Sequence, residues 1–238
     1  MQEEYRFGAM VIDAAHFLPH SRARLFIVGA RADLEIPRCA KRSAPDPLWH
    51  SAVIRERVKQ LPLKARRRWV WWKLPAPPSR KTVFSDVIEN KPQGVDWHSP
   101  EETRRLLDLM SEVNRAKVYA AQSTGRRIIG GVYKRTRNGE QRAEVRFDDV
   151  AGCLRTPVGG SSRQTILIVE GSRIRSRLLS PREAARLMGL PESYNLPDRY
   201  NEAYHIAGDG LAVPVVRHLA ASIFEPLLSR AERLAAVG

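Results

Sequence analysis

LLSPREAARLMGLPESYNLPDRYNEAYHIAGDGLAVPVVRHLAA, residues 178–221, is the stretch that decides the fold. It opens with a helix start: Ser180 can accept a hydrogen bond from the first turn, Glu183 can reach back to it, and Pro181 suits the first helical position. Gly189 is typical of a helix end. The apolar face of this expected helix consists of Ala184, Leu187 and Met188.

A turn and a second helix are expected later in the same stretch. Gly208 and Gly210 flank Asp209, which predicts a turn. The apolar residues that follow predict a buried helix and are Leu211, Val213, Val215, Val216, Leu219, Ala220 and Ile223. Taken alone, this pattern indicates only a helix, a turn and a core helix.

A second block lies near the N-terminus, where residues 11–29 spell VIDAAHFLPHSRARLFIVG. The continuous apolar run at residues 25–28 is typical of a sheet strand covered on both faces. Arg22 and Arg24 precede it. An isolated Arg-x-Arg before a strand is most often only a solvent-exposed start of that strand. This pair therefore indicates a function only in combination with other blocks.

A third block spans residues 153–166, CLRTPVGGSSRQTI. Its small residues and paired glycines allow a backbone to pass close to another surface or to a phosphate. The alternative is a flexible turn.

In this order, the three blocks resemble the C-terminal portion of a DNA cytosine-5-methyltransferase. Residues 178–221 are similar to the family's last two motifs, and residues 11–29 to its Pro-Gln-x-Arg-x-Arg block and the strand after it. His20 stands where the family usually has Gln. Residues 153–166 resemble the segment that closes the target-recognition region.

The resemblance implies an α/β chain. It would be the C-terminal part of a Rossmann-like S-adenosylmethionine-dependent methyltransferase fold with an inserted mixed, β-rich target-recognition domain. Residues 1–30 would carry the Arg-x-Arg block and a strand of the catalytic domain, and 31–151 the DNA-binding domain. Residues 152–190 would close the small domain, and 191–238 would return to the catalytic domain.

The resemblance also assigns site residues. Arg22 and Arg24 would finish the base pocket. The segment beside the cofactor, S-adenosylmethionine, would be Gly208, Asp209, Gly210, Ala212 and Val213. The family more often has Asn at position 209, and Asp there removes an amide donor. No metal site is expected, because the two cysteines lie far apart and form no Cys-x-x-Cys.

The nucleophile is missing from this pattern. Cytosine C6 must be attacked by a thiolate, which the family carries in a Pro-Cys-Gln loop upstream of the Arg-x-Arg block, with its acid and most of its cofactor site. Cys39 follows Arg38 and lies after that block, and Cys153 sits inside the third block. Both are expected to be buried small hydrophobes. The chain is therefore predicted to be inactive without an N-terminal half, supplied by another polypeptide or lost from this gene.

Charge points to the middle segment as the DNA-binding part. Residues 31–151 hold 26 Lys and Arg against 15 Asp and Glu, which gives +11 of the total +14. Such a field attracts a polyanion such as double-stranded DNA and releases counterions on binding. The alternative is a merely soluble basic domain. The expected DNA contacts are Arg66, Arg67, Arg68, Thr124, Arg126, Arg127, Lys134, Arg135, Arg137 and Arg163.

Local patterns subdivide this middle segment. Trp69 and Trp71 should share one face of a strand, and at least one of the neighbouring tryptophans should be core. Asn138-Gly139 predicts a hairpin turn. One helix is expected near residues 99–118, after a Pro- and Arg-rich linker at 37–47, and residues 229–238 should be a fraying helical tail.

No membrane span or secretory leader is expected, which favours a cytoplasmic, nucleoid-associated protein of prokaryotic or phage-like origin. Two rivals to a methyltransferase portion remain. One is a non-catalytic DNA-binding protein or gene remnant, and the other is a restriction-associated or regulatory subunit that binds a methyltransferase. Exposed apolar surface is expected on the isolated chain at residues 25–28 and 211–223, because both segments lack the sheet they should cover.

Overall fold

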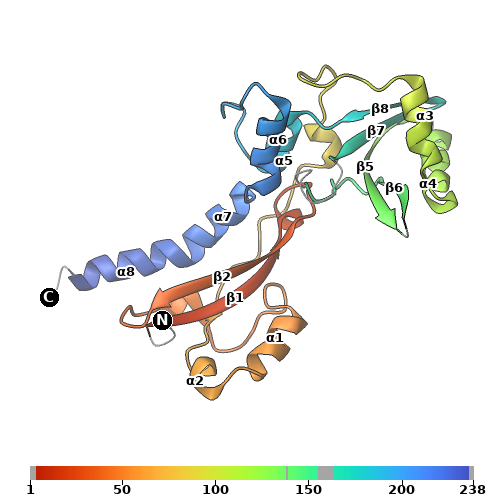
Figure 1. Cartoon of the computed structure of the whole chain (residues 1–238). Helices are drawn as coiled ribbons and strands as arrows, with labels where there is room; N and C mark the ends of the chain where they lie inside the picture. Colours follow the sequence, from red (N-terminus) through yellow and green to blue (C-terminus); the bar gives the residue numbers. More distant parts are fainter. Residues whose placement is uncertain (1–3, 138, 155–162, 236–238) are drawn as a thin grey trace. The chain divides into compact units, whose positions relative to one another are not determined.

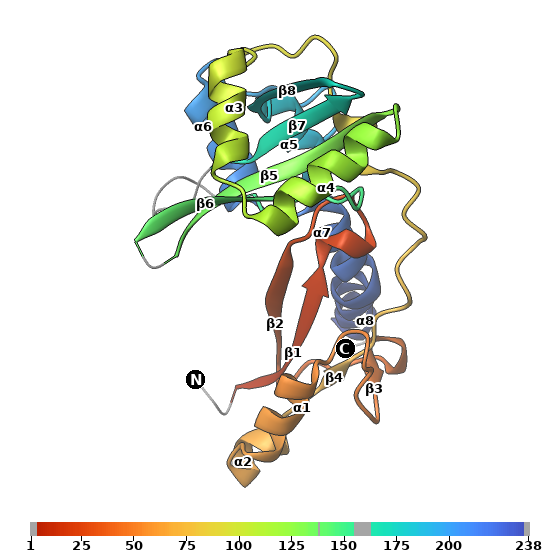
Figure 2. The same ribbon diagram turned by 90° about the vertical axis from the view of Figure 1, so that its right-hand side faces the viewer.

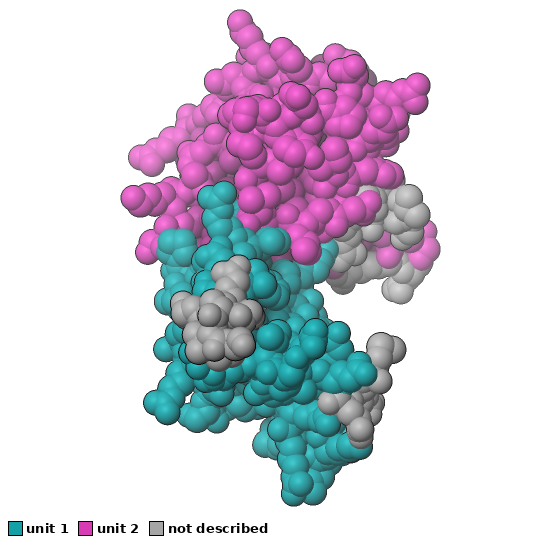
Figure 3. Space-filling view, turned by 90° about the vertical axis from the view of Figure 1, so that its left-hand side faces the viewer, with its two compact units in different colours: residues 1–13, 23–78, 214–238 teal, residues 14–22, 79–213 magenta. Residues whose placement is uncertain are grey.

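The computed structural model describes residues 4–137, 139–154 and 163–235 and has a mixed α/β fold (Figure 1). The chain divides into two compact units, coloured separately in Figure 3. Unit 1 contains residues 1–13, 23–78 and 214–238, and unit 2 contains residues 14–22 and 79–213.

Unit 1 combines two nine-residue strands and two two-residue strands with helices in the middle and at the C-terminal end of its sequence. In chain order its elements are β1 (Tyr5–Asp13), β2 (Ala23–Arg31), η2 (Arg38–Ala40), β3 (Lys41–Arg42), α1 (Ala52–Lys59), α2 (Leu63–Arg66), β4 (Trp71–Trp72), most of α7 (Val213–Leu219), the π-helical turn η4 (Ala220–Phe224) and α8 (Glu225–Ala235).

Unit 2 is built around a sheet. Its elements are η1 (Ala14–His16), η3 (Phe84–Val87), α3 (Pro100–Asp108), α4 (Glu112–Ser123), β5 (Arg127–Arg137), β6 (Glu140–Arg146), β7 (Thr165–Glu170), β8 (Arg173–Leu178), α5 (Pro181–Leu187) and α6 (Tyr200–Asp209).

Strands β1 and β2 form an antiparallel pair whose second face is covered at β1 but exposed at β2. Successive side chains point to opposite faces of a strand, and Met10, Ile12 and Val28 are buried on one side. On the other side Leu25 is 58% exposed and Ile27 is 70% exposed. The expectation that residues 25–28 are covered on both faces is therefore wrong for this chain, whereas the expected exposed apolar surface is confirmed.

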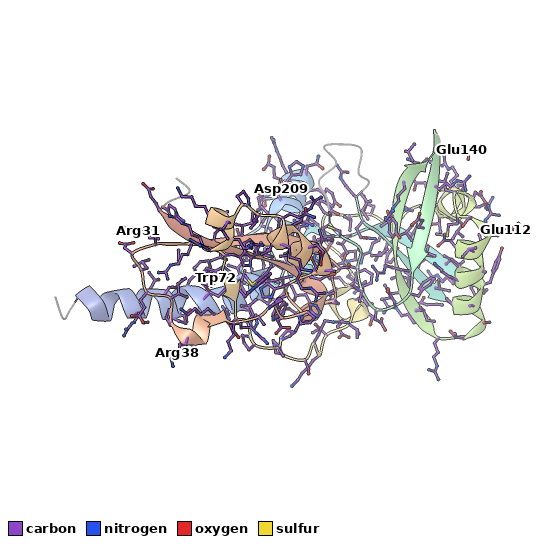
Figure 4. The ribbon with its side chains drawn as sticks, turned by 90° about the horizontal axis from the view of Figure 1, so that it is seen from below. Arg31, Arg38, Trp72, Glu112, Glu140 and Asp209 are labelled. Atoms are coloured by element: carbon purple, nitrogen blue, oxygen red, sulfur yellow. The ribbon has the colours of Figure 1, made fainter. Side chains whose placement is uncertain are left out.

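Trp72 is the centre of the packing in unit 1. Its side chain is fully buried, and its Nε1–H donates to the Val28 carbonyl at 3.2 Å (Figure 4). Gly8 lies so close that an added Cβ would be 2.0 Å from the Val70 carbonyl oxygen. Trp69 and Trp71 contact each other edge to face with ring centroids 5.4 Å apart. Trp69 and Trp71 thus lie together and Trp72 is a core residue, as expected, but the expected strand is confirmed only at Trp71–Trp72, because Trp69 lies before β4.

The C-terminal helical run of unit 1 buries one residue in four, at Val215, Leu219, Ile223 and Leu227. A spacing of four drifts around an α-helix with about 3.6 residues per turn, and the wider π turn at η4 compensates for that drift. The sequence had suggested a buried helix from Leu211 onward. Leu211 lies before α7 and is 51% exposed, and Val216 within α7 is 41% exposed, so this expectation is only partly met.

The sheet of unit 2 has the order β6-β5-β7-β8 with every pair antiparallel. Helices α3 and α4 lie against one face of it (Figure 2). The hairpin predicted at residues 138–139 is confirmed, since Arg137 pairs with Glu140, although Asn138 itself lies outside the described residues. The core between helices and sheet is formed by Leu106, Met110, Val118, Ala121, Val132, Ala143, Val145, Leu167 and Val169.

The single helix expected at residues 99–118 is instead the pair α3 and α4. Its predicted capping box at Ser99 is confirmed. The backbone of Leu109, however, accepts a hydrogen bond from the Ala143 N–H at 2.9 Å, and Met110 forms a bridge to the same residue. Pairing with β6 thus replaces helical hydrogen bonds at this point.

Helix α5 matches its prediction closely. Ser180 and Glu183 form the capping box, and Gly189 has a φ of +75° that favours glycine. Glu183 is fully buried and also pairs with the fully buried Arg177, with Oε1 2.6 Å from Nη2. One carboxylate therefore both caps the helix and neutralises a buried guanidinium.

Three smaller expectations need correction. Gly208 and Asp209 do not lie in a turn, because α6 continues through them and ends at Gly210. Cys39 is exposed and Cys153 is half-buried, so neither is a buried hydrophobe. In η2 it is the neighbouring Ala40 that fills the core.

The stretch Tyr200–Arg230 is long and apolar enough to cross a membrane by length and composition, and 18 consecutive residues within it have a mean hydropathy of 1.4. Its backbone becomes extended at Gly210, where ψ is 166°, and helix resumes at Val213. Because helix α6 ends inside this stretch, the stretch is only weak evidence for a membrane-spanning helix.

Candidate functional site

His20 ties distant segments of unit 2 together. It is fully buried, its Nε2 accepts a hydrogen bond from the Leu154 N–H at 3.1 Å, and its Nδ1 lies 3.2 Å from the Leu187 carbonyl oxygen. An Nε2 that accepts has no proton, so Nδ1–H donates to that carbonyl. Neutral imidazole offers one donor and one acceptor, as a Gln amide also does. His20 thus bridges the two segments with one donor and one acceptor.

Arg22 holds the other side of the same segment. It is 5% exposed; Nη1 donates to the Leu154 carbonyl at 2.8 Å, and Nη2 donates to the carbonyls of Gly208 and Gly210 at 2.7 and 2.9 Å. Leu154 therefore has its N–H held by His20 and its carbonyl held by Arg22.

Backbone contacts reinforce this junction. The N–H of Ala151 donates to the Pro19 carbonyl at 2.8 Å, and the N–H of Ser21 donates to the Ala151 carbonyl at 2.9 Å. The structure thus brings together residues 19–22, 151–154 and 208–210, one segment from each of the three blocks found in the sequence. We call this set of segments the three-block junction.

Arg24 has different surroundings. It is a half-buried residue of β2 opposite Ile12, and its Nη1 donates to the Ala23 carbonyl at 2.9 Å. The two arginines of the Arg-x-Arg block therefore differ, because Arg22 is committed to backbone carbonyls of the junction.

The expected cofactor segment is partly exposed. Gly208 and Ala212 are buried, and the Val213 N–H donates to the Met188 carbonyl at 2.9 Å. Asp209 is exposed at the end of α6 (Figure 4), and Gly210 is half-buried. A side chain at Gly210 would clash, since a Cβ there would be 2.6 Å from the Ile206 carbonyl oxygen.

The expected DNA contacts of unit 2 separate into distinct environments. Arg127 is bound to Glu170 at 3.1 Å and to Asn90 at 3.0 Å. Thr124 caps α4 through the Ala121 carbonyl at 2.8 Å. Arg163 lies over the Tyr200 ring, with 5.2 Å between the guanidinium carbon and the centroid.

The remaining contacts of unit 2 lie on or beside the hairpin. Arg126 and Arg135 are exposed and Lys134 is half-buried, whereas the side chain of Arg137 lies outside the described residues. Arg135 lies over the Tyr133 ring at 4.8 Å.

The basic cluster of unit 1 lies on and after α2. Arg66 and Arg67 are exposed and Arg68 is half-buried. The Nη1 of Arg66 donates to the Lys59 carbonyl at 3.3 Å. Exposed arginines of this kind can contact phosphates without choosing a sequence.

Sequence reasoning missed Tyr133 and Glu144, which are opposite each other in the register of the hairpin. Burial and a hydrogen bond to Glu144 raise the pKa of the Tyr133 hydroxyl. The sequence contained the information needed to find this pair, because a two-residue turn at 138–139 fixes the register of the hairpin and with it every cross-strand pair.

Comparison with known proteins identifies the family. The model of the C-5 cytosine-specific DNA methylase family matches residues 1–225. The chain therefore belongs to this family.

Three curated relatives are similar over short stretches. The type II methyltransferase M1.ScrFI of Lactococcus lactis subsp. cremoris is 36% identical over 61 residues, which are 26% of this chain and 16% of the relative. M.SsoII of Shigella sonnei is 34% identical over 61 residues, with the same two shares. M.NlaX of Neisseria lactamica is 33% identical over 67 residues, 28% of this chain and 21% of the relative. The match thus covers about a fifth or less of each relative.

Proposed function

We propose that this chain is the C-terminal, target-recognising portion of a DNA cytosine-5-methyltransferase. The observation that carries the proposal is the three-block junction. Segments that resemble three family blocks meet through His20 and Arg22, at sequence separations of up to 188 residues. Family membership over residues 1–225 supports the same conclusion.

The proposed division of labour follows the family pattern. Residues 1–30 and 191–238 belong to a Rossmann-like catalytic domain, residues 31–151 form the inserted domain that recognises double-stranded DNA, and residues 152–190 close it. The excess of positive charge in residues 31–151 supports this assignment, because it supplies affinity for a polyanion.

The proposed cofactor is S-adenosylmethionine, which supplies the methyl group for cytosine C5. Asp209 is exposed, and its carboxylate can accept hydrogen bonds from ammonium or hydroxyl groups, so the donor set of such a ligand fits it. Buried Gly208 and Ala212 would shape the wall, and Gly210 and Val213 would complete the segment.

Arg24 is the arginine that we assign to the flipped base or its adjacent phosphate. Arg22 would act indirectly, by fixing the backbone of residues 154, 208 and 210. The thiolate that attacks C6 and the acid near N3 would come from a methyltransferase portion outside these 238 residues, since neither Cys39 nor Cys153 follows a proline.

Exposed apolar side chains support docking of that portion on unit 1. Leu25 and Ile27 project from β2, which pairs only with β1 among the described strands. Phe224 and Leu228 are 41% and 63% exposed, one turn apart on the C-terminal helical run. Exposed apolar side chains of this kind are typical of interaction sites. We propose a cytoplasmic enzyme that works on the nucleoid.

The test is methyl transfer from labelled S-adenosylmethionine to DNA. The chain is assayed alone and together with a protein that carries the N-terminal half, from the upstream reading frame. We expect activity only in the mixture, and Arg24→Ala should abolish it while Arg217→Ala, an exposed arginine elsewhere, should not.

Activity of the chain alone would overturn the assignment of the nucleophile to another portion. Inactivity of the mixture with salt-sensitive DNA binding retained would instead identify a non-catalytic binding or regulatory remnant.

A further inference from the structure

The β5–β6 hairpin continues past the described part of β7. Among the described strands, β5 pairs with β7 only as far as Val132, opposite Thr165, and from Tyr133 onward it pairs with β6. Figure 2 shows the two strands extending together beyond β7, and Glu140 lies at their tip in Figure 4. A two-stranded ribbon of this kind fits the major groove of B-form DNA.

One face of this ribbon is polar. Tyr133 pairs with Glu144, and Arg135 pairs with Arg142, so these four side chains point to the same side. The opposite side carries Ala143, which is buried against the helices. The polar face is therefore the one that the ribbon can present to a partner.

Arg135 is held on this face by two neighbours. Its guanidinium carbon lies 4.8 Å from the centroid of the Tyr133 ring, and its Nε is 3.9 Å from Oε2 of Glu144. Its side chain remains 53% exposed. Stacking and a partner carboxylate fix the plane of the guanidinium before any ligand arrives, which lowers the entropy lost on binding.

The neighbouring arginines are used differently. Arg142 donates from Nη2 to Glu140 at 3.1 Å, and Arg146 pairs with Asp148 through both Nε and Nη2. In these side chains a terminal nitrogen is engaged by a carboxylate. Arg135 instead contacts Glu144 through Nε and Tyr133 through its planar face, and its side chain is more than half exposed.

We infer that Arg135 reads a guanine in the major groove, with its two terminal nitrogens on O6 and N7 and with Tyr133 and Glu144 as its support. Bidentate pairing of arginine with these two acceptors is the commonest specific base contact. The inference rests on the proposed function and adds to it the residue that chooses a base.

The test is selection from a pool of random double-stranded DNA by the full chain, followed by sequencing. We expect the unaltered chain to enrich sequences with a fixed G·C pair. Arg135→Ala should lose roughly 5- to 150-fold of the preference at that pair. Arg135→Lys keeps the charge but not the fork, so it should lose the same preference while retaining salt-dependent affinity.

Arg142→Ala is the matched control, because Arg142 lies directly opposite on the same face and is similarly exposed. It should weaken binding equally for all sequences. As a second arm, 7-deazaguanine at the preferred position removes N7. It should weaken the unaltered chain and leave Arg135→Ala unaffected.

The outcomes separate the inference from the proposal beneath it. If Arg135→Ala lowers affinity uniformly, or if the unaltered chain binds DNA without enriching any sequence, Arg135 is not a base reader although DNA binding stands. If the chain binds no DNA at all, both the inference and the proposed function fail.

Discussion

At the scale of single residues, the junction depends on Leu154, whose two backbone polar groups are held by two different side chains. A buried polar group without a partner costs about 1–3 kcal/mol. His20 therefore stabilises unit 2 by satisfying Leu154 and Leu187 at once, and the site is inseparable from the fold around it.

His20→Leu should consequently lower the free energy of unfolding by about 2–5 kcal/mol, because it leaves an N–H and a carbonyl buried without partners. His20→Gln retains a donor and an acceptor and should cost less than half as much. Urea unfolding followed by circular dichroism measures both. Equal losses in the two variants would show that shape rather than hydrogen bonding matters at this position.

The buried pair of Arg177 and Glu183 gives a second prediction. Glu183→Ala should destabilise the protein by about 3–5 kcal/mol, since it strands a fully buried guanidinium. The double variant Arg177→Met, Glu183→Leu removes both charges and should recover part of that loss. Thermal unfolding of the unaltered chain, the single variant and the double variant measures these differences. A double variant that is less stable than Glu183→Ala would contradict the prediction.

His50 predicts a dependence of stability on pH. Burial lowers its pKa from the usual 6.5, so the unfolded chain takes up a proton before the folded chain does. The contribution to stability is thus present above pH 6.5 and is lost as the pH falls through the folded pKa. Its ring packs edge to face on Trp71.

The measurement for His50 is the free energy of unfolding at pH 7.5 and pH 5.5. His50→Gln should lower stability at pH 7.5 yet lose less between the two values than the unaltered chain does. His98, whose pKa is also lowered by burial, still titrates in both proteins and serves as an internal control. An unchanged pH dependence would show that His50 does not contribute to it.

At the scale of elements, the distance to neighbouring atoms, rather than the β-strand propensity of the residue, decides where β1 and β2 tolerate a side chain in place of glycine. Gly8→Ala in β1 should cost about 1–3 kcal/mol through overpacking, because its Cβ would meet the Val70 carbonyl and the Trp72 ring. Gly29→Ala in β2 is the control, since the nearest atom to its Cβ lies 3.7 Å away. Comparable losses in denaturant titrations of the two variants would contradict this reasoning.

Elements that depend on neighbours in the sequence were predictable. The capping boxes at Ser99 and Ser180 and the hairpin at 138–139 follow from local hydrogen bonding and turn geometry. The break between α3 and α4 was not, because it is caused by the Ala143 N–H on a strand more than thirty residues away. Local patterns carry no information about such a partner.

The same distinction holds for the candidate site. The three blocks and their order pointed to Arg22 and Arg24, yet the sequence could not separate the two arginines. Their difference comes from carbonyls up to 188 residues away, which bind Arg22. The departure at His20 looked like a lost amide, and only the contacts of both ring nitrogens revealed an equivalent bridge.

At the scale of the whole molecule, the exposed side chains of Leu25 and Ile27 on β2 are the proposed docking surface for the N-terminal half. Leu25→Ser combined with Ile27→Ser should weaken binding of an N-terminal methyltransferase half at least tenfold, because side chains of this size contribute about 1.5–3 kcal/mol each when buried. Both are exposed in this chain, so its own unfolding should change little. Calorimetric titration of the half into the chain tests the first point and thermal unfolding the second.

The path of the chain has a consequence for how recognition specificities are exchanged between genes. Residues 14–22 belong to the same unit as residues 79–213, so the chain passes between units at 13/14, 22/23, 78/79 and 213/214. A recombination event that replaced residues 79–213 alone would bring a new hairpin but leave behind the His20 and Arg22 of the old parent. Under the proposed function, inheritance of a foreign specificity therefore requires that the short 19–22 loop match the new residues 151–154 and 208–210 that it contacts.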